Sequence, residues 1–462
     1  MNSATSAGAA VADELESGRS MFAIVNARED RARRGVGFHL APLAAAIGLS
    51  FSGAASAATI TVNNGGSTSV AGSCTIVDAV ASINQGSLVV GSNCANVGTF
   101  GSSDTIEFDA DYDIVFSTSA NGRSALVLTK PLTIKGAVDA NGKPLVTIRR
   151  SSVSGTAHFR VLETNSDLTL YGVTISNGYS DGSVDTSASG GDGGGVLASG
   201  RDSTITITNS VLSGNIARSG GNDGLGGGIY AITGSTLSLT DSSITGNMAS
   251  VLGGGINSHG SITAVGSTIS GNVVPGGLGG GIYASGAVGL SNTTVSGNTA
   301  YSGGGGVYAG TATLTFCTIA NNRLHAANYP GAGVLVQANS SATATLITGN
   351  GPGKDLDGAN AGLTLGGDHD LIGTHGATIG VPADTKTCDP YLGPLFDNGG
   401  PTLTQPLFAG SCALDAGPAD PVLLVDQRGL PRKIGAFADI GAFERQGPGD
   451  PPDLIFVSGF EP

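Results

Sequence analysis

Between about residue 160 and residue 350 the chain repeats one unit, made of a Gly-rich step, a β-branched strand and a short turn that ends in Asn. From Ile229 onward, successive Gly steps lie 27, 26, 25 and 27 residues apart and end at Ile229, Ile256, Ile282, Val307 and Val334. A period in the twenties is typical of a solenoid, in which each unit buries its apolar face only by stacking on a neighbour. The units are rich in strand formers and lack helical periodicity. They predict an all-β fold, a right-handed parallel β-helix with small capping regions at both ends.

The coil from Gly226 to Asn247 shows how one unit folds. Ile229, Leu237 and Leu239 alternate with polar residues, which places these three side chains on one face of their strands. The Gly triplets suit a corner where side chains would collide or where backbone passes close to backbone. Like residues of stacked coils lie about 4.8 Å apart, so we expect an internal amide ladder of the turn residues. Its members would be Asn247, Asn272 and Asn298.

The composition predicts a neutral, hydroxyl-rich surface. Charged residues make up 12% of the chain and Trp is absent, so the exterior must consist mainly of Ser, Thr, Asn and Gly. The net charge of −14 argues against a nucleic-acid partner, because phosphate binding needs clustered Lys and Arg. We expect a monomer.

The N-terminus resembles a secretory signal. Arg31, Arg33 and Arg34 form a basic region, an apolar core follows from Leu40 to Phe51, and Ala55-Ser56-Ala57 fits a cleavage site. We therefore expect a signal peptide over residues 1–57, with Met21 as an alternative start to Met1, and a secreted, cell-surface or outer-membrane location. The apolar core is too short for a stable membrane span, so no transmembrane segment is expected after its removal.

The five cysteines fit an exported protein, because export makes disulfides accessible. Cys74 lies near Cys94, and Cys388 near Cys412, so two local bridges are the simplest pairing. Sequence spacing leaves other pairings open. Cys317 is left over, and we expect a buried, inert thiol there rather than a catalytic one.

Two segments resemble secreted bacterial surface proteins. The Gly-Gly-Gly-Ile steps with their Asn-ended turns resemble the repeats of polymorphic outer-membrane proteins, although the Phe of those repeats is missing. Residues 72–108 resemble the N-terminal segment of proteins named for a CSLREA motif, through Cys74, Ala79 and the stretch Asp104 to Phe108. Val77 and Asp78 replace the Arg and Glu of that motif.

The C-terminal segment carries the most specific resemblance. GPLFDNGGPTLTQPLFAGSCALDAG, then DQRGLPR and DIGAFE, is similar to the choice-of-anchor Q module, and the final DLIFVSGFEP resembles a sorting tail. This family is defined by its anchoring end, so the resemblance implies a surface location and no reaction. The predicted domains are a signal peptide (1–57), an N-terminal cap (58–110), β-helix repeats (111–385), the choice-of-anchor Q-like module (386–445) and a flexible tail with a sorting-like end (446–462).

Many parallel β-helices, those of the pectate lyase-like class, cleave acidic polysaccharides, which requires paired carboxylates or a calcium site with a base. Between Ile205 and Asn350 the acids are Asp223 and Asp241 alone, and both sit in turn sequences. An enzyme would have to place its site at an end of the solenoid. The candidates there are Asp368, His369, Asp370 and His375, which also fit a polar turn.

The C-terminal module offers a second place for chemistry. Its charged residues are expected to form ion pairs that close the end of the solenoid, with a carboxylate-bound calcium ion as the alternative. No other cofactor or metal is expected. The residues concerned are Asp389, Asp397, Asp415, Asp426, Asp439, Glu444, Arg428, Arg432 and Lys433.

One row of side chains favours recognition. The residue after each Gly-step Ile or Val should point outward, which would align Tyr230, Tyr283 and Tyr308 in an aromatic stripe suited to sugar rings. Tyrosines in a ladder also stack on one another for stability. The leading hypothesis is a non-catalytic, adhesin-like protein that binds an extracellular glycan or a host or neighbouring cell surface. The alternatives are a polysaccharide lyase or glycosidase, and a purely structural envelope component.

Overall fold

The computed structural model describes residues 56–182, 190–218 and 224–450. All of them belong to one compact unit. The predicted leader lies almost wholly outside the described residues, as do Asp223 and the sorting-like end of the tail. Across the described ranges no helix is long and apolar enough to cross a membrane.

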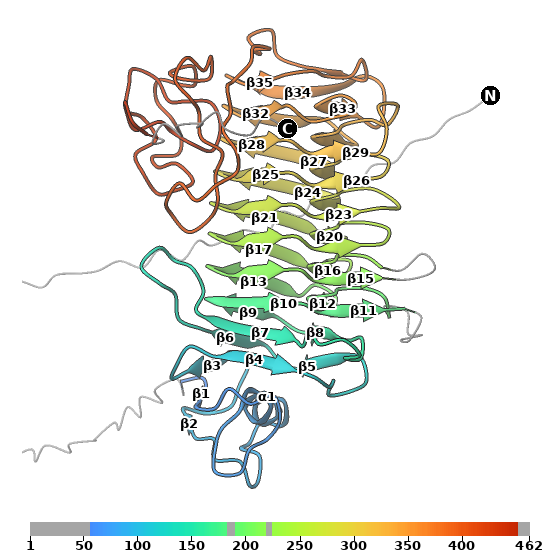
Figure 1. The fold of residues 1–462 in the computed structure, drawn as a ribbon, viewed down its shortest axis with the longest axis vertical. Helices are drawn as coiled ribbons and strands as arrows, with labels where there is room; N and C mark the ends of the chain where they lie inside the picture. Colours follow the sequence, from blue (N-terminus) through green and yellow to red (C-terminus); the bar gives the residue numbers. More distant parts are fainter. Residues whose placement is uncertain (1–55, 183–189, 219–223, 451–462) are drawn as a thin grey trace, which may run out of the picture. The chain divides into compact units, whose positions relative to one another are not determined.

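The described chain winds into stacked coils whose strands pair in parallel with the coils before and after (Figure 1). One wall of the solenoid is a ten-stranded parallel sheet formed by β4 (Asp113–Phe116), β7 (Val146–Arg150), β10 (Val173–Ser176), β14 (Val211–Ser213), β18 (Ser243–Thr245), β22 (Thr268–Ser270), β25 (Thr294–Ser296), β28 (Thr318–Ala320), β32 (Leu346–Thr348) and β35 (Leu371–Ile372). A second wall is a six-stranded sheet formed by β11 (Tyr179–Asp181), β15 (Ile216–Arg218), β19 (Met248–Ala249), β23 (Val273–Val274), β26 (Thr299–Ala300) and β29 (Arg323–Leu324).

A twenty-stranded sheet completes the coils with two adjoining stacks of strands. The Gly-step stack holds β5 (Ser124–Leu128), β8 (Arg160–Thr164), β12 (Val196–Ala198), β16 (Ile229–Ala231), β20 (Ile256–Ser258), β30 (Val334–Val336) and β33 (Leu356–Gly358). The next stack holds β1 (Thr59–Val62), β3 (Asp104–Phe108), β6 (Leu132–Lys135), β9 (Leu168–Tyr171), β13 (Thr204–Thr208), β17 (Thr236–Thr240), β21 (Ser261–Val265), β31 (Ser340–Thr343), β34 (Leu363–Asp368) and β36 (Ile379–Gly380). The long strands β24 (Ile282–Ser291) and β27 (Val307–Thr315) belong to both stacks, and β2 (Asn96–Val97) pairs antiparallel with β1.

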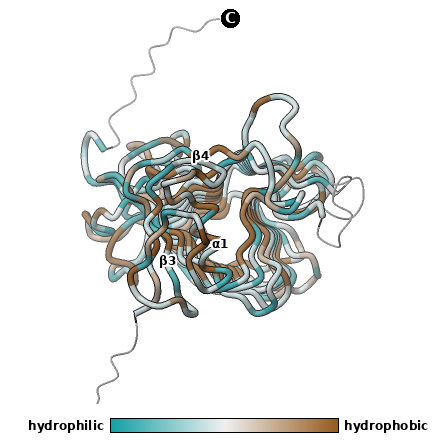
Figure 2. Tube along the Cα trace, turned by 90° about the horizontal axis from the view of Figure 1, so that it is seen from below, coloured by the Kyte–Doolittle hydropathy of each residue, from teal (hydrophilic) through white to brown (hydrophobic). Residues whose placement is uncertain are grey.

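The apolar core fills the inside of the coils. Ile229, Leu237 and Leu239 are fully buried, as their alternation predicts. The same inward positions of neighbouring coils lie over one another, so hydrophobic residues line the interior of the stack (Figure 2). Burial of each such side chain is worth about 1.5 to 3 kcal/mol, and only the stacking of coils provides it.

Each glycine of a Gly step is required for a different steric reason, as the triplet Gly253 to Gly255 shows. Gly253 has a left-handed φ of 63°. A Cβ at Gly254 would lie 2.5 Å from the carbonyl oxygen of Gly280 in the next coil. A Cβ at Gly255 would approach the side chain of Asn272 to 3.0 Å. Side chains are therefore excluded by the backbone of the next coil and by the Asn amide of the same coil, as the sequence predicts.

The predicted amide ladder exists and is longer than expected. The Nδ2 group and the main-chain N–H of each Asn donate to Oδ1 of the Asn in the next coil, at 2.8 to 3.0 Å. The ladder begins at the N–H of Gly178 and ends at the carboxylate of Asp355, which accepts both donors of Asn350. Its amide members are Asn215, Asn247, Asn272, Asn298, Asn322 and Asn350, all buried.

A second ladder, which the sequence analysis missed, follows the corner before the ten-stranded sheet. A main-chain N–H donates to the side-chain oxygen of the next coil at Ser210, Ser242, Ser267 and Thr293, and again at Thr345 and Asp370. Cys317 occupies the ladder position between Thr293 and Thr345 and is fully buried. Burial raises the pKa of its thiol to about 12, which makes it inert, in agreement with the prediction.

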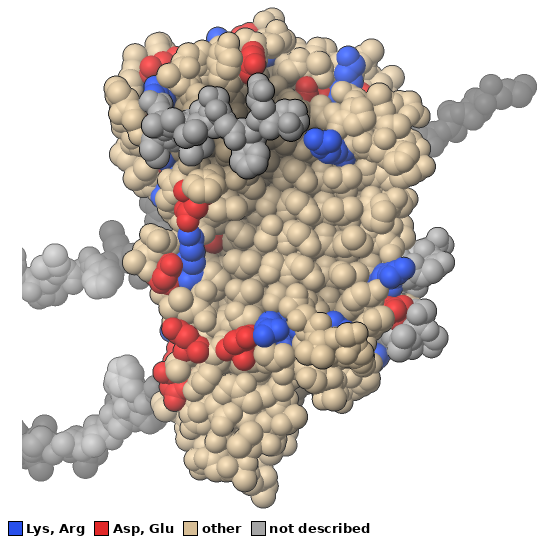
Figure 3. Space-filling model, viewed as in Figure 1, with Lys and Arg blue, Asp and Glu red and all other residues tan. Residues whose placement is uncertain are grey.

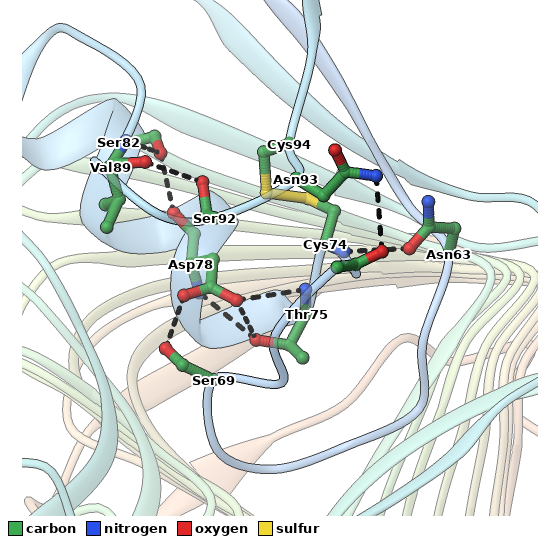
Figure 4. The surroundings of a disulfide bond; sticks show 11 residues. Asn63, Ser69, Cys74, Thr75, Asp78, Ser82, Val89, Ser92, Asn93 and Cys94 are labelled. Carbon is green, nitrogen blue, oxygen red and sulfur yellow. Dashed lines mark hydrogen bonds between the residues drawn. A yellow bond between two sulfur atoms is a disulfide. The ribbon is translucent and has the colours of Figure 1, made fainter.

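The N-terminal end is closed by α1 (Ile76–Gln85), which packs its apolar face on the first coils (Figure 1). Thr75 caps this helix and Asp78 completes a capping box with it, so the residue that departs from the CSLREA pattern has a structural role. The disulfide between Cys74 and Cys94 ties the start of α1 to the loop behind it (Figure 4). The second disulfide joins Cys388 to Cys412, so both predicted bridges are confirmed.

The C-terminal module corrects one expectation, because it lies along the flank of the last coils and does not simply close their end (Figure 1). Thr402 donates to the carbonyl oxygen of Gly266 at 2.7 Å, and Gly441 donates to that of Ala344 at 2.9 Å. Lys143 forms an ion pair of 2.6 Å with Asp397. Contacts therefore run over many coils, and the outer face of the ten-stranded sheet is covered there.

Gln427 and Arg432 fasten the module to the corner of the solenoid. The Gln427 amide bonds to Ser267, Thr268 and Thr294 of successive coils, at 2.6 to 3.1 Å. The Arg432 guanidinium is fully buried, donates to Asn292, and lies 4.4 Å from the ring centroid of Phe316. Burial lowers the pKa of Arg432 to about 10. The predicted ion pairs are thus in part hydrogen bonds that hold the module against the coils.

Candidate functional site

The structure does not bring the four end candidates together. His369 has a φ of 57° and stands at the corner where the coils before it place Asn292, Phe316 and Ala344, which also have left-handed φ. Asp368 ends β34 and contacts His369 at 3.3 Å, whereas His375 bridges to Leu356, beyond β35 along the coil. The four residues therefore do not form the predicted acid–base or metal site. His369 is a corner residue flanked by Asp368 and Asp370, and His375 lies in a different stack of strands.

Asp370 has a structural task as the last member of the second ladder. Its Oδ1 accepts the N–H of Thr345 at 2.9 Å, and its Oδ2 is buried with no hydrogen-bond partner. Burial, together with the nearby charges of Asp368 and Asp384, raises the pKa of this carboxyl group to about 8. A perturbed acid of this kind can mark an active site, but here burial at the end of the ladder accounts for the raised pKa.

The tyrosine row is in register but is only partly exposed. Tyr230 pairs with Asn257, Asn257 with Tyr283, and Tyr283 with Tyr308 in successive strands. Tyr283 and Tyr308 stack with ring centroids 4.8 Å apart, and Tyr308 is only 8% exposed. Asn257 is fully buried. The expectation of an open aromatic stripe needs this correction, because the rings serve first as packing along the sheet.

The segment before each Gly step lies close to this outer row of side chains at one point. Leu225, Leu252, Leu278 and Gly303 form a row of parallel bridges of their own. A Cβ at Gly303 would touch the side chains of both Leu278 and Leu335, so this row meets the outer row at that point. Sequence alternation alone cannot show that a second layer lies outside a strand.

The adjoining stack presents an open surface, which we name the hydroxyl face: the outward rows of β13, β17, β21, β24 and β27. In these rows Thr204 pairs with Thr236 and Thr236 with Ser261, and all three are exposed. A parallel row runs from Thr206 through Ser238 and Thr263 to Gly289 and Thr313. The C-terminal module packs on the ten-stranded sheet and not on the hydroxyl face. A broad stretch of the middle coils shows no Lys, Arg, Asp or Glu (Figure 3).

The carboxylates of the C-terminal module are engaged by the backbone. Both oxygens of Asp439 accept main-chain N–H groups, from Asp415 and Arg445. Glu444 likewise accepts from Asp439 and Ile434, and burial raises its pKa to about 8. Among residues 56–182, 190–218 and 224–450, no group of three or more His, Cys, Asp or Glu is arranged to hold a metal ion.

Sequence reasoning missed a compact cluster of ionisable and aromatic side chains at the start of the repeats. It consists of Arg150, His158, Tyr179, Asp181 and Arg218, which span three coils. Stacking of β11 on β15 places Asp181 opposite Arg218. The available signal was the concentration of charge just before coils that carry almost none.

The match to a family model agrees with this fold. Residues 194–369 match the family model described as right handed beta helix region. The described part of the chain is a right-handed parallel β-helix. No curated protein matches the sequence. Among solved structures, that of pectate lyase Pel9A is similar at 13% identity and a TM-score of 0.40, covering 83% of this chain and 96% of that one.

Proposed function

We propose that this protein is a secreted or cell-surface β-helical protein that attaches, like an adhesin, to a polysaccharide through its hydroxyl face. The observation that carries the proposal is the exposed register of that face, in which Thr204, Thr236 and Ser261 repeat from strand to strand. Strand spacing sets the repeat at about 4.8 Å. A hydroxyl both donates and accepts hydrogen bonds, so such rows suit a polymer whose own hydroxyl groups repeat.

The half-buried Tyr283 supports the same surface. It lies on β24, whose other end carries Gly289 and Ser291 of the hydroxyl rows. An aromatic ring beside rows of hydroxyls combines an apolar contact with hydrogen bonds, which is the usual chemistry of sugar recognition. We further propose an extracellular glycan or neighbouring cell surface as the partner, a monomeric protein, and no cofactor.

Location belongs to the same proposal. Two disulfides are compatible with an oxidising compartment. The leader over residues 1–57 and the resemblance of residues 386–445 to a choice-of-anchor Q module support export and surface attachment. The alternative of a lyase or glycosidase at the C-terminal end of the solenoid has little support, because His369 serves a corner and Asp370 a ladder.

The test is retention of the full chain on insoluble polysaccharides. Thr236→Glu with Thr263→Glu should lower retention by at least about tenfold, because the charges interrupt the hydroxyl rows. Ser213→Glu with Thr245→Glu is the matched control, since it also puts two charges on adjacent coils, one of them the coil of Thr236, but on the ten-stranded sheet. Equal retention of the two variants, or no retention of the native protein on any insoluble polysaccharide, would refute the proposal.

A further inference from the structure

One hairpin of the C-terminal module exposes several large apolar side chains. Its two arms meet where Val425 bridges antiparallel to Pro431. We call residues 422–434 the apolar hairpin, because five of its large apolar side chains are between 39% and 81% exposed. They are Val422, Leu424, Val425, Leu430 and Ile434. A cluster of exposed apolar side chains on a soluble protein often marks an interaction site.

The apolar hairpin is well fixed, so its exposure does not come from a loose loop. The main-chain N–H of Arg432 donates to the carbonyl oxygen of Leu424 at 2.9 Å, and that of Asp426 to the carbonyl oxygen of Leu430 at 2.7 Å. Asp426 and Arg428 form a buried ion pair of 2.8 Å, and Arg432 is buried as well. A surface that is already ordered loses little freedom when it binds a partner.

The described chain ends beside this hairpin. Arg428 Nη1 donates to both carboxylate oxygens of Asp450, at 3.2 and 3.3 Å. Arg445 Nε donates to the carbonyl oxygen of Asp450 at 2.8 Å, and Gln446 Nε2 donates to that of Pro431 at 3.0 Å. The segment that follows Asp450 therefore starts at the apolar hairpin.

That segment is itself apolar. Residues 451–462 read PPDLIFVSGFEP and lie outside the described residues. They contain an apolar run from Leu454 to Val457 and, further on, Phe460. An extended chain spans about 3.3 to 3.6 Å per residue, so Leu454 can lie at most about 14 Å from Asp450, and Phe460 at most about 35 Å. These lengths allow the tail to lie along the hairpin.

The charges agree with this occupant. Residues 451–462 include Asp453 and Glu461 and no Lys or Arg. Lys433 is exposed within the apolar hairpin, and its ammonium group donates to the carbonyl oxygen of Ala419. The hairpin thus offers a positive charge beside its apolar side chains, which favours an apolar segment flanked by acids.

We propose that the apolar hairpin is the docking site of this chain's own tail, residues 451–462. This goes beyond attachment through the hydroxyl face and does not depend on it. Because the tail starts at Asp450, its effective concentration at the hairpin is about 1 mM. A second copy fits less well, since a stable interface uses about 20 to 30 residues on each side. Docking removes the apolar side chains of both segments from water and withholds the tail from other partners.

The experiment compares hydrogen exchange of the amides of residues 422–434 in the full chain and in a chain that ends at Asp450. With a dissociation constant of about 0.1 mM for the free tail, an effective concentration of about 1 mM should slow exchange about tenfold. Removal of the tail should therefore speed exchange about tenfold, while amides of β13 keep their rates. A synthetic peptide of residues 451–462, added at about 1 mM, should restore the slow exchange.

Substitutions in the full chain separate docking from folding. Leu424→Asp should speed exchange as loss of the tail does, because it puts a charge among the apolar side chains. Val90→Asp is the matched control, since Val90 is also a fully exposed apolar residue but lies in the loop after α1, and it should change nothing. Phe456→Ser with Phe460→Ser should act like Leu424→Asp. Retention on insoluble polysaccharide should be equal in all variants, which separates this proposal from the hydroxyl face.

Three results would overturn the proposal. The first is equal exchange of residues 422–434 with and without the tail. The second is slow exchange that depends on protein concentration and accompanies a doubled mass in light scattering, because the occupant would then be a second copy. The third is slow exchange that appears only when phosphatidylcholine vesicles are added, which would assign the apolar hairpin to a lipid surface.

Discussion

Replacing Asn272 by Ala should cost more stability than almost any other single change on the coils. The Asn272 side chain takes part in four hydrogen bonds: its Nδ2 donates to Ile244 O and Asn298 Oδ1, and its Oδ1 accepts two N–H groups of Asn247. All three Asn side chains are buried, so water does not replace these bonds.

The magnitude follows from the donors that are left behind. Without Asn272 Oδ1, the main-chain N–H and one amide N–H of Asn247 have no acceptor. Each buried, unsatisfied donor costs about 1 to 3 kcal/mol, so the free energy of unfolding should fall by about 2 to 6 kcal/mol. Thr263→Ala is the matched control, because Thr263 is exposed on the neighbouring strand. It should change the free energy of unfolding by no more than about 0.5 kcal/mol.

Urea denaturation followed by far-ultraviolet circular dichroism measures the difference, with the midpoint and slope compared between variants. A loss below about 1 kcal/mol for Asn272→Ala, or a loss equal to that of Thr263→Ala, would show that the amide ladder does not stabilise the coils.

Three further outcomes are expected. Because the folded pKa of Asp370 is raised to about 8, protonation of this group stabilises the folded state; its contribution to stability should be complete below about pH 4 and be lost as pH rises through 8. Asp370→Asn should raise the melting temperature at pH 9 and flatten that dependence, and an unchanged melting curve at pH 9 would contradict it. Gln427→Ala should loosen the C-terminal module from the ten-stranded sheet, so amides of β22 and β25 should exchange hydrogen faster while those of β13 do not. Cys74→Ser with Cys94→Ser should destabilise the N-terminal cap by about 2 to 4 kcal/mol, seen as an earlier urea transition, and an unshifted midpoint would count against it.

The coil geometry could be predicted because each position repeats. The positions of Ile229, Leu237 and Asn247 recur at nearly fixed spacing, so the structure of one coil predicts that of the others. Because the coils stack, an Asn at the same position in each coil forms a ladder. The second ladder was also present in the sequence, one residue after each corner. It was missed because Cys317 and Asp370 stand in positions that Ser or Thr fills elsewhere.

The candidate site could be predicted less well, because its contacts join residues that are far apart in the sequence. Tyr308 follows the outward phase of its strand, yet it is buried, stacked on Tyr283 and hydrogen-bonded by Gln337. Gln427 reaches Ser267 across 160 residues, and no local pattern encodes such a contact. His158 and Arg218 likewise come together only through the stacking of β11 on β15.

Both ladders end on an aspartate, and this gives the solenoid a defined length. From Asn215 to Asn322, each Asn donates hydrogen bonds to the Asn of the next coil. A duplicated coil inserted in this range would therefore continue the same hydrogen bonds on either side. The side chain of Asp355 accepts both donors of Asn350 but has no amide N–H to pass on. Asp370 is likewise the last side-chain acceptor of the second ladder. Relatives that differ in coil number should differ between these limits, with the two aspartates remaining in the last coil.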